Sequence, residues 1–274
     1  MTGLTARPAI PADHPHFVRL FPELGTGDPV LPADRWAETM APATLFFEDE
    51  AGAVVGYVFF QVLRGTGYVR HVVVDPGRRG EGFGRAIMQV IAARLRAAGC
   101  ARWCLNVKPD NEPAIRLYRA VGMAPAYTAV VFRFGWDLLD RLPRGDRAVT
   151  ARLVEPADEA AIEAAFGMPA GQIDAARKRP EIVLLRLADP AAPEDAHLGF
   201  AAYDPRFPGA FPFRVADPTL AMPLLEAIRP HEAPGTPHMQ IVSEDAPLTV
   251  AMTAAGAIVR LETLHMVGEV PAAP

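Results

Sequence analysis

The chain has 274 residues and a formal net charge of −5, with 50% hydrophobic and 22% charged residues. This length allows one large core or two ordinary ones, and the composition is typical of a soluble globular protein and unlike that of a disordered chain. The acidic balance argues against nucleic-acid binding, which a strongly basic domain usually accompanies. No apolar run approaches the roughly 18 residues of a membrane helix. Residues 1–11 do not resemble a signal peptide, so we expect a cytoplasmic protein without membrane contact.

The two cysteines, Cys100 and Cys104, are four positions apart. A structural metal site would need a second Cys or His pair at ligand spacing, and the sequence offers none. We therefore expect buried thiols and no metal.

The first half of the chain predicts alternating strands and helices around one dominant sheet. Glycines and prolines separate these elements and mark their ends. The expected strands are 4–8, 44–48, 54–63, 69–74, 103–107 and 127–134, and the expected helices are 12–20, 33–40, 84–98 and 112–121.

The second half repeats this order after a stretch, 137–148, whose mixed charges, Pro143 and Gly145 indicate a linker. Its expected strands are 151–153, 182–187 and 198–203, and its expected helices are 157–166 and 172–178. Self-similarity on this scale suggests a duplication. The predicted domains are therefore 1–136 and 149–274.

The repeat also shows what the second copy has lost. Pro76 is 12 positions before Met88, whereas Pro218, its counterpart, is four positions before Met222. The difference of eight matches the length of the glycine-rich tract 77–84. Residues 111–122 and 245–256 both span 11 positions, and Tyr118 of the first copy falls on Met252 of the second.

The glycine-rich tract lies between the strand that ends at Val74 and a long amphipathic helix. Gly80, Gly82 and Gly84 allow backbone amides to approach a ligand, and the start of the helix adds partial positive charge. Three arginines flank the tract, at positions 78, 79 and 85. The tract lacks the lysine and hydroxyl residue of a P-loop and the spacing of a dinucleotide motif. A phosphate cradle is the prediction, and a mobile basic loop is the alternative.

These residues resemble the acetyl-CoA motif of the GCN5-related N-acetyltransferase (GNAT) superfamily. The signature Arg/Gln-x-x-Gly-x-Gly/Ala is met by Arg79, Gly82 and Gly84, and the tract 111–123 resembles the second motif of that family. The resemblance covers about residues 4–135. It implies an α/β (α+β) protein with two tandem GNAT-like domains, each a mixed, mostly antiparallel sheet flanked by helices. The second domain would be a degenerate copy without the pyrophosphate loop.

The resemblance also implies roles for individual residues. The backbone of Val72, Val73 and Val74 would pair with the pantetheine arm and place an amide near the thioester carbonyl. Asn111 would hydrogen-bond the cofactor, Ala114 would leave room for it, and Tyr118 would protonate the leaving thiolate. The alternative for Tyr118 is a half-buried helix residue. The amides that would hold the pyrophosphate belong to Arg79, Gly80, Glu81, Gly82, Phe83, Gly84 and Arg85.

The group that accepts the proton of the acceptor amine is left open. The family position for a carboxylate base is Tyr68 here, and strand alternation turns His71 to the face opposite Tyr68 and Arg70. Glu48 and Asp49 could act through water, and a water chain with no dedicated residue is equally consistent.

A wall of aromatic and acidic residues is expected beside the acceptor. Carboxylates among aromatic rings would suit a cationic amine, although an ordinary solvated helix face explains the same pattern. The aromatic residues are Phe17, Phe21 and Trp36, and the acidic ones are Glu23, Asp28, Asp34 and Glu38.

The expected activity is transfer of the acetyl group of acetyl-CoA to an amine of a small molecule or peptide, by direct attack in a ternary complex. Neither cysteine has an evident histidine partner, which argues against a covalent enzyme intermediate. The alternative is a non-catalytic acyl-CoA-binding or scaffold protein. The acceptor, the acyl-chain preference and the role of the second domain stay open, as does the quaternary state, with a homodimer among the options.

Overall fold

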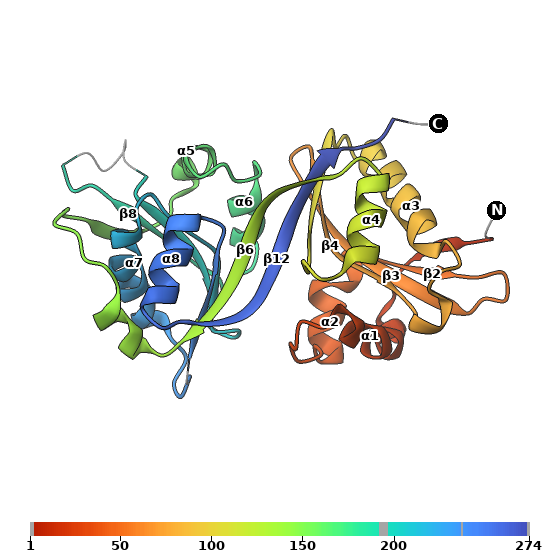
Figure 1. Ribbon diagram of the computed structural model, residues 1–274, viewed down its shortest axis with the longest axis horizontal. Helices are drawn as coiled ribbons and strands as arrows, with labels where there is room; N and C mark the ends of the chain where they lie inside the picture. Colours follow the sequence, from red (N-terminus) through yellow and green to blue (C-terminus); the bar gives the residue numbers. More distant parts are fainter. Residues whose placement is uncertain (1–2, 192–196, 237, 273–274) are drawn as a thin grey trace. The chain divides into compact units, whose positions relative to one another are not determined.

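The computed structural model describes residues 3–191, 197–236 and 238–272. The chain forms two compact units, each built of β-strands and helices (Figure 1). Unit 1 contains Met1–Ala126 together with Leu264–Pro274, and unit 2 contains Tyr127–Thr263. No helix of the described residues is both long and apolar enough to cross a membrane.

The sheet of unit 1 is mostly antiparallel, with one parallel pair. Its strands are β1 (Thr5–Pro8), β2 (Thr44–Glu48), β3 (Val54–Leu63), β4 (Thr66–Val74), β5 (Arg102–Val107) and the C-terminal part of β12 (Ile258–Glu269). The strands β1 to β4 form an antiparallel meander, and β4 then pairs with β5 in parallel. The stretch Leu264–Glu269 of β12 runs antiparallel along the other edge of β5.

Helices cover both faces of this sheet. The short helices α1 (His14–Leu20) and α2 (Ala33–Thr39) pack on one face through an aromatic core that includes the buried side chain of Tyr57. The helices α3 (Phe83–Ala97) and α4 (Glu112–Ala120) pack on the other face, around Leu105 of β5 and Met266 of β12. In α3 the side chains of Ile87, Ile91 and Leu95 are completely buried, as their helical spacing predicts.

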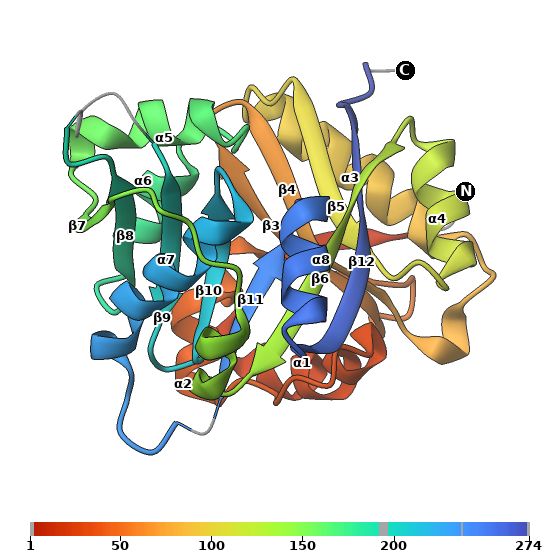
Figure 2. The ribbon, with the colours of Figure 1, turned by 60° about the vertical axis from the view of Figure 1, so that its left-hand side comes forward.

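Unit 2 has the same order of elements (Figure 2). Its strands are β7 (Thr150–Leu153), β8 (Val183–Ala188), β9 (Gly199–Asp204), β10 (Gly209–Val215), β11 (Met239–Ser243) and part of β6 (Ala124–Phe134), and its helices are α5 (Glu159–Ala165), α6 (Gln172–Arg177), α7 (Ala221–Ile228) and α8 (Ala246–Ala254). As in unit 1, neighbouring strands are antiparallel except for one parallel pair, here β10 and β11.

Local details support the duplication. The side chain of Asn111 accepts a hydrogen bond from an amide in the first turn of α4, and Asp245 does the same at the start of α8. Both helices have nine residues. Each is followed by a glycine with a positive φ, 89° at Gly122 and 88° at Gly256.

The two copies differ most at the start of the helix after the parallel-paired strand. In unit 1 a 3-10 helix, Pro76–Arg78, is followed by the loop 79–82 before α3 begins. In unit 2 the corresponding 3-10 helix, Pro218–Leu220, continues directly into α7. The long α3 has 15 residues and α7 has eight. The loop is therefore a feature of unit 1.

The edge strands do not follow the predicted domain boundaries. Sequence order would complete the first domain with the strand 127–134. Instead, Val130–Phe134 of β6 pairs with β11 of unit 2, and the C-terminal part of β12 pairs with β5 of unit 1. A duplicated fold permits this exchange because the two strands occupy equivalent positions in two similar sheets. The ranges 1–136 and 149–274 remain the predicted bounds of the two sequence copies. The compact units have different bounds, because each includes one strand from outside its own copy.

The stretch predicted as a linker is also partly structured. It begins within a 3-10 helix, Trp136–Arg141, and the side chains of Leu138, Leu139 and Leu142 are buried in the core of unit 2. Because charged residues lie between and beside these leucines, the sequence pattern did not indicate that they are buried. Residues 137–142 therefore belong to unit 2.

Candidate active site

The strands β4 and β5 separate in the middle of unit 1. Their parallel pairing extends from Thr66 and Arg102 to Val69 and Leu105, whereas β4 continues to Val74. On its other edge β4 remains paired with β3 as far as Val74. One edge of the segment 70–74 therefore lies beyond its ladder with β5, as an added extended ligand requires.

A β-bulge occurs where the strands separate. Phe59 of β3 pairs with His71 and Phe60 pairs with Val69, so Arg70 is the extra residue in β4. Since Gln61 pairs with Tyr68, and Gln61 and Phe59 share one face of β3, Tyr68 and His71 share one face of β4.

The bulge corrects the expected orientation of His71. Its ring contacts Phe21, Tyr57 and Phe59 on the side of the early helices, and its Nδ1 lies 3.2 Å from the Tyr57 hydroxyl. Burial, together with the charge of Arg70, lowers the pKa of His71 to about 3. An imidazole with that pKa is a weak base at neutral pH.

The glycine loop presents a series of unused amides. In the described part of the chain, the backbone N–H groups of residues 80–84 make no hydrogen bond. Gly80 and Gly82 have φ angles of 85° and 86°, and a Cβ at either would have no neighbour within 4 Å. Five consecutive amides at the start of a 15-residue helix form a site suited to a phosphate group.

Gly84 has a different reason for being glycine than the one expected from the sequence. Its φ is not in the left-handed region, and a Cβ there would lie 3.1 Å from Cδ2 of Leu117 on α4. The small residue allows α3 and α4 to pack closely. Phe83 likewise contributes only its backbone to the loop, because its side chain is buried in the core.

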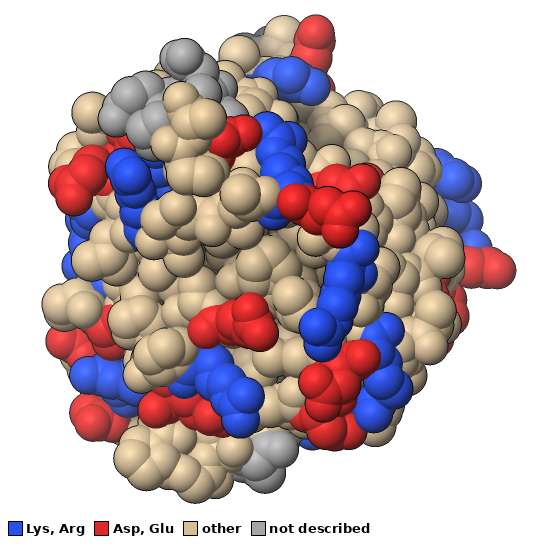
Figure 3. Space-filling model, turned by 90° about the vertical axis from the view of Figure 1, so that its left-hand side faces the viewer, with Lys and Arg blue, Asp and Glu red and all other residues tan. Residues whose placement is uncertain are grey.

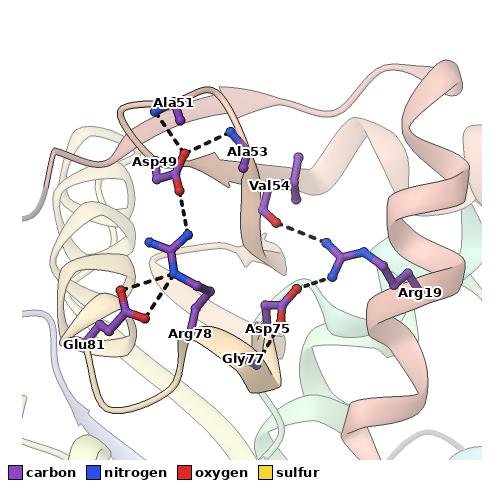
Figure 4. A network of polar contacts seen from close by, with 9 residues as sticks. All are labelled: Arg19, Asp49, Ala51, Ala53, Val54, Asp75, Gly77, Arg78 and Glu81. Carbon is purple, nitrogen blue, oxygen red and sulfur yellow. Dashed lines mark hydrogen bonds and ion pairs between the residues drawn. The ribbon is translucent and has the colours of Figure 1, made fainter.

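Charged side chains hold the loop in place (Figure 4). Arg78 forms ion pairs with Glu81 at 3.1 Å and with Asp49 at 2.5 Å, and its guanidinium lies over the ring of Phe83. Arg19 of α1 pairs with Asp75, whose side chain also accepts a hydrogen bond from the amide of Gly77. The pKa of Asp49 is lowered mainly by its hydrogen bond from Arg78, and the pKa of Asp75 is lowered mainly by its hydrogen bond from Arg19.

Ion pairs of this kind also engage several residues to which the sequence assigned other roles. Arg79 binds Glu23 at 2.7 Å and the carbonyl of Val74 at 3.3 Å, while Arg85 is exposed at the start of α3. Glu48 pairs with Arg7 at 2.6 Å. Since Asp49 and Glu48 both accept from arginines, neither is an apt proton acceptor.

Helix α4 supplies the predicted proton donor. Tyr118 is 6% exposed and lies in the core that contains α3, and burial raises the pKa of its hydroxyl. No described residue forms a hydrogen bond with this hydroxyl. Half-buried Ala114 lies one helical turn earlier. The Oδ1 atom of Asn111 accepts from the amide of Ala114 at 3.2 Å, a capping role that the sequence analysis did not assign.

The expected acceptor wall is largely interior. Phe17 and Trp36 have 0% exposure and stack on each other, and Phe21 packs beside them. These rings form the core beneath α1 and α2, so they cannot line an open cavity. Of the expected acidic residues, Glu23 forms an ion pair with Arg79.

A polar group missed in the sequence lies on the same face of the sheet. Asn106 of β5 donates from Nδ2 to the Tyr68 hydroxyl at 2.9 Å, and its Oδ1 lies 2.8 Å from Nδ1 of His265. His265 belongs to β12, 159 residues further along the chain. No local sequence signal connects these residues, because only the exchanged strand brings them together.

Residues 15–123 match the model of the acetyltransferase (GNAT) family. These residues are therefore similar to a GNAT domain. The whole chain also resembles a solved tandem GNAT protein from the clavulanic acid biosynthesis pathway, with a TM-score of 0.59, 17% identity and coverage of 99% of this chain and 100% of the other. The recognition of the family and the expected tandem α/β fold are therefore confirmed.

Among proteins of named function, the GNAT domain is similar to acetyltransferases. A mycothiol acetyltransferase from Kineococcus radiotolerans is 33% identical over an alignment of 145 residues that covers 48% of this chain and 46% of that protein. A streptothricin acetyltransferase from Streptomyces lavendulae is 32% identical over 117 residues, which are 42% of this chain and 60% of that protein. The similarity thus spans 46% of the first relative's length and 60% of the second's.

Proposed function

We propose that unit 1 transfers an acetyl group from acetyl-CoA to the amine of a small molecule, by direct attack in a ternary complex. The observation that carries this proposal is the coincidence, within the region similar to a GNAT domain, of three features: a separated β4 edge, five backbone amides that bond to no described residue, and the Tyr118 hydroxyl, which also bonds to no described residue. The two named relatives, which are acetyltransferases, support the same reaction class.

The residues present fit acetyl-CoA. The amides of residues 80–84 would hold its pyrophosphate, with Arg79 and Arg85 adding positive charge and Glu81 keeping Arg78 in place. The edge of Val72, Val73 and Val74 would pair with the pantetheine arm. When bound, the cofactor would supply a thioester as acyl donor.

The acid–base requirement falls on the protein. The Tyr118 hydroxyl would donate a proton to the departing sulfur, and its raised pKa keeps it protonated at neutral pH. An amide of the β4 edge would stabilise negative charge on the carbonyl oxygen. No cluster of three or more potential metal ligands occurs among the described residues, and the proposed chemistry uses none.

A small amine is the proposed acceptor class. The relatives' names point to small molecules, mycothiol and streptothricin. On the molecular face in Figure 3, basic and acidic side chains lie interspersed, in agreement with the modest net charge of −5. On that face, such a mixture of charges gives no support to a polyanionic partner.

The test combines thiol release with acetyl-CoA binding. The wild-type chain should release coenzyme A thiol from acetyl-CoA when an amine panel containing streptothricin, spermidine and L-lysine is present. Gly82→Val should remove the rise in melting temperature that acetyl-CoA causes, because a branched side chain at φ 86° distorts the amide cradle.

Gly256→Val is the matched control, since Gly256 has φ 88°, has open space around it and lies in unit 2. It should lose intrinsic stability and still respond to acetyl-CoA. An acetyl-CoA response that survives in Gly82→Val would contradict the loop assignment. Binding without thiol release across the panel would instead favour a non-catalytic acyl-CoA-binding protein.

A further inference from the structure

We propose that His265, delivered by the C-terminal strand, is the general base that removes a proton from the acceptor amine. This inference rests on the proposed acetyltransferase function and identifies the group that the sequence left open. It begins from three hydrogen-bonded side chains on three strands of unit 1: Tyr68 on β4, Asn106 on β5 and His265 on β12.

The strand registers place this group where the strands separate. Val69 and Leu105 form the last pair between β4 and β5, so Asn106 is the first β5 residue beyond that ladder. Asn106 is exposed and pairs directly with His265. The imidazole therefore lies beside the opening in which the reacting groups would meet.

The direction of attack favours the same face. Tyr118, α3 and α4 cover the opposite face of the sheet through a continuous apolar core. Tyr68 and Cys104 are paired across β4 and β5, and Asn106 follows Cys104 by two residues, so these side chains and His265 share the other face. An amine that approaches the opening from this face meets the exposed Asn106, and the imidazole of His265, itself 7% exposed, lies directly behind it.

Hydrogen bonding defines which imidazole nitrogen is basic. Oδ1 of Asn106 only accepts, so Nδ1 of His265 carries the hydrogen in their 2.8 Å contact. The lone pair of the neutral ring then lies on Nε2. The Tyr68 ring fixes the imidazole edge-on at 6.1 Å, and the Arg70 guanidinium lies 3.5 Å from the Tyr68 ring centre.

The proton balance is complete. An ammonium proton passes to Nε2 of His265, directly or through a hydroxyl or water that donates to Nε2, and leaves its electron pair on nitrogen. That pair bonds to the acetyl carbon while the C–S bond breaks, and the sulfur takes a proton from Tyr118. The new amide nitrogen returns its surplus proton to Tyr118 through solvent, and His265 releases its proton to water.

Other titratable groups near the opening are less suitable. Of the groups facing His265 from β4 and β5, Tyr68 and Cys104 have higher ordinary pKa values than imidazole, and Arg70 stays charged. His71 is hydrogen-bonded to the Tyr57 hydroxyl and packs against Phe21 and Phe59 on the side of the early helices. Histidine is the side chain whose ordinary pKa, about 6.5, suits proton removal near neutral pH.

The experiment compares His265→Gln with His231→Gln, whose histidine is exposed in unit 2. With acetyl-CoA and the panel amine that reacts fastest with wild type, His265→Gln should lower kcat/KM by about 10²–10⁴-fold at pH 7. The loss should shrink as the pH approaches the amine's own pKa, about 10 for a lysine-like amine, because the acceptor then deprotonates without help. His231→Gln should retain the wild-type profile.

Two readouts do not depend on turnover. His265→Gln should keep the acetyl-CoA-induced rise in melting temperature, and the acceptor amine should protect His265 from carbethoxylation by diethylpyrocarbonate in wild type. An unchanged pH profile in His265→Gln, or a lost acetyl-CoA response, would overturn the base assignment. If wild type itself shows no acetyl-CoA response and no thiol release, the proposed acetyltransferase function fails instead.

Discussion

Tyr118 has the surroundings that a proton donor requires. Its side chain is held in the core of unit 1, and no described residue occupies its hydroxyl. Burial raises the pKa above the ordinary value near 10, so the hydroxyl loses its proton only in strongly alkaline solution. The donor form is therefore present throughout the neutral range.

Replacing Tyr118 by phenylalanine keeps the ring and removes the donor. We expect kcat for acetyl transfer to fall about 10²–10³-fold while the affinity for acetyl-CoA changes less than threefold, because only the transition state uses the proton. Steady-state kinetics and calorimetric binding measure the two quantities. Equal losses in both would assign Tyr118 a packing role.

Met252 occupies the equivalent position in unit 2, where no proton donor is available. Its side chain is completely buried, and a thioether cannot donate a proton. The burial of both residues indicates that this helix position is part of the core in either copy. Tyr118 therefore fills the same packing position as Met252 and, in addition, carries a hydroxyl group.

At the scale of elements, the long strand β12 contributes residues to both units. Its first residues belong to unit 2, where the Thr263 hydroxyl donates to the carbonyl of Ala129, and its last residues complete the sheet of unit 1. The carbonyl of Pro271 accepts from Arg96 of α3, and the amide of Val270 donates to the carbonyl of Ala101. These contacts anchor the strand that carries His265.

Gly268→Ala should loosen this strand. A Cβ at Gly268 would lie 2.7 Å from the Gly122 carbonyl oxygen and 3.1 Å from Nε1 of Trp103. Because backbone atoms cannot yield easily, we expect a loss of about 1–3 kcal/mol in the free energy of unfolding, measured by urea denaturation.

Val259→Ala is the control for this prediction, since Val259 lies in the same strand and is 49% exposed. Its effect on stability should stay within about 0.5 kcal/mol, as for most surface substitutions. If Gly268→Ala were as stable as this control, the close approach of β12 to Gly122 would not be a constraint.

For the whole molecule, the main asymmetry is one loop in two similar folds. Unit 2 repeats the sheet, the helix caps and the turn glycines of unit 1, yet α7 begins directly after its 3-10 helix. With no loop at that point, unit 2 lacks the run of amides that precedes α3. The cofactor loop is therefore confined to unit 1.

The duplication therefore predicts the binding stoichiometry. Isothermal titration with acetyl-CoA should give about one site per chain, because a phosphate cradle requires amides at a helix start. Gly82→Val should abolish this heat signal altogether. Two sites per chain in wild type, with one surviving in Gly82→Val, would show that unit 2 binds the cofactor without the loop.

The sequence by itself indicated the family resemblance and the repeat, and it predicted the candidate cofactor residues. These depend on local patterns, namely a glycine-rich turn between a strand and a helix, and the Asn111–Tyr118 spacing on the next helix. Local chemistry also governs the helix caps and turn glycines, so most elements of unit 1 lie within two residues of their expected bounds.

Only the tertiary structure decided which strands complete each sheet, which face His71 occupies and which groups lie beside the opening. The bulge at Arg70 adds one residue to β4 and so reverses the alternation after it. The exchange of β6 and β12 depends on pairing between segments more than 100 residues apart, and residue spacing does not encode it. His265 lies next to Asn106 for that reason alone, and the proton acceptor became visible only in the folded chain.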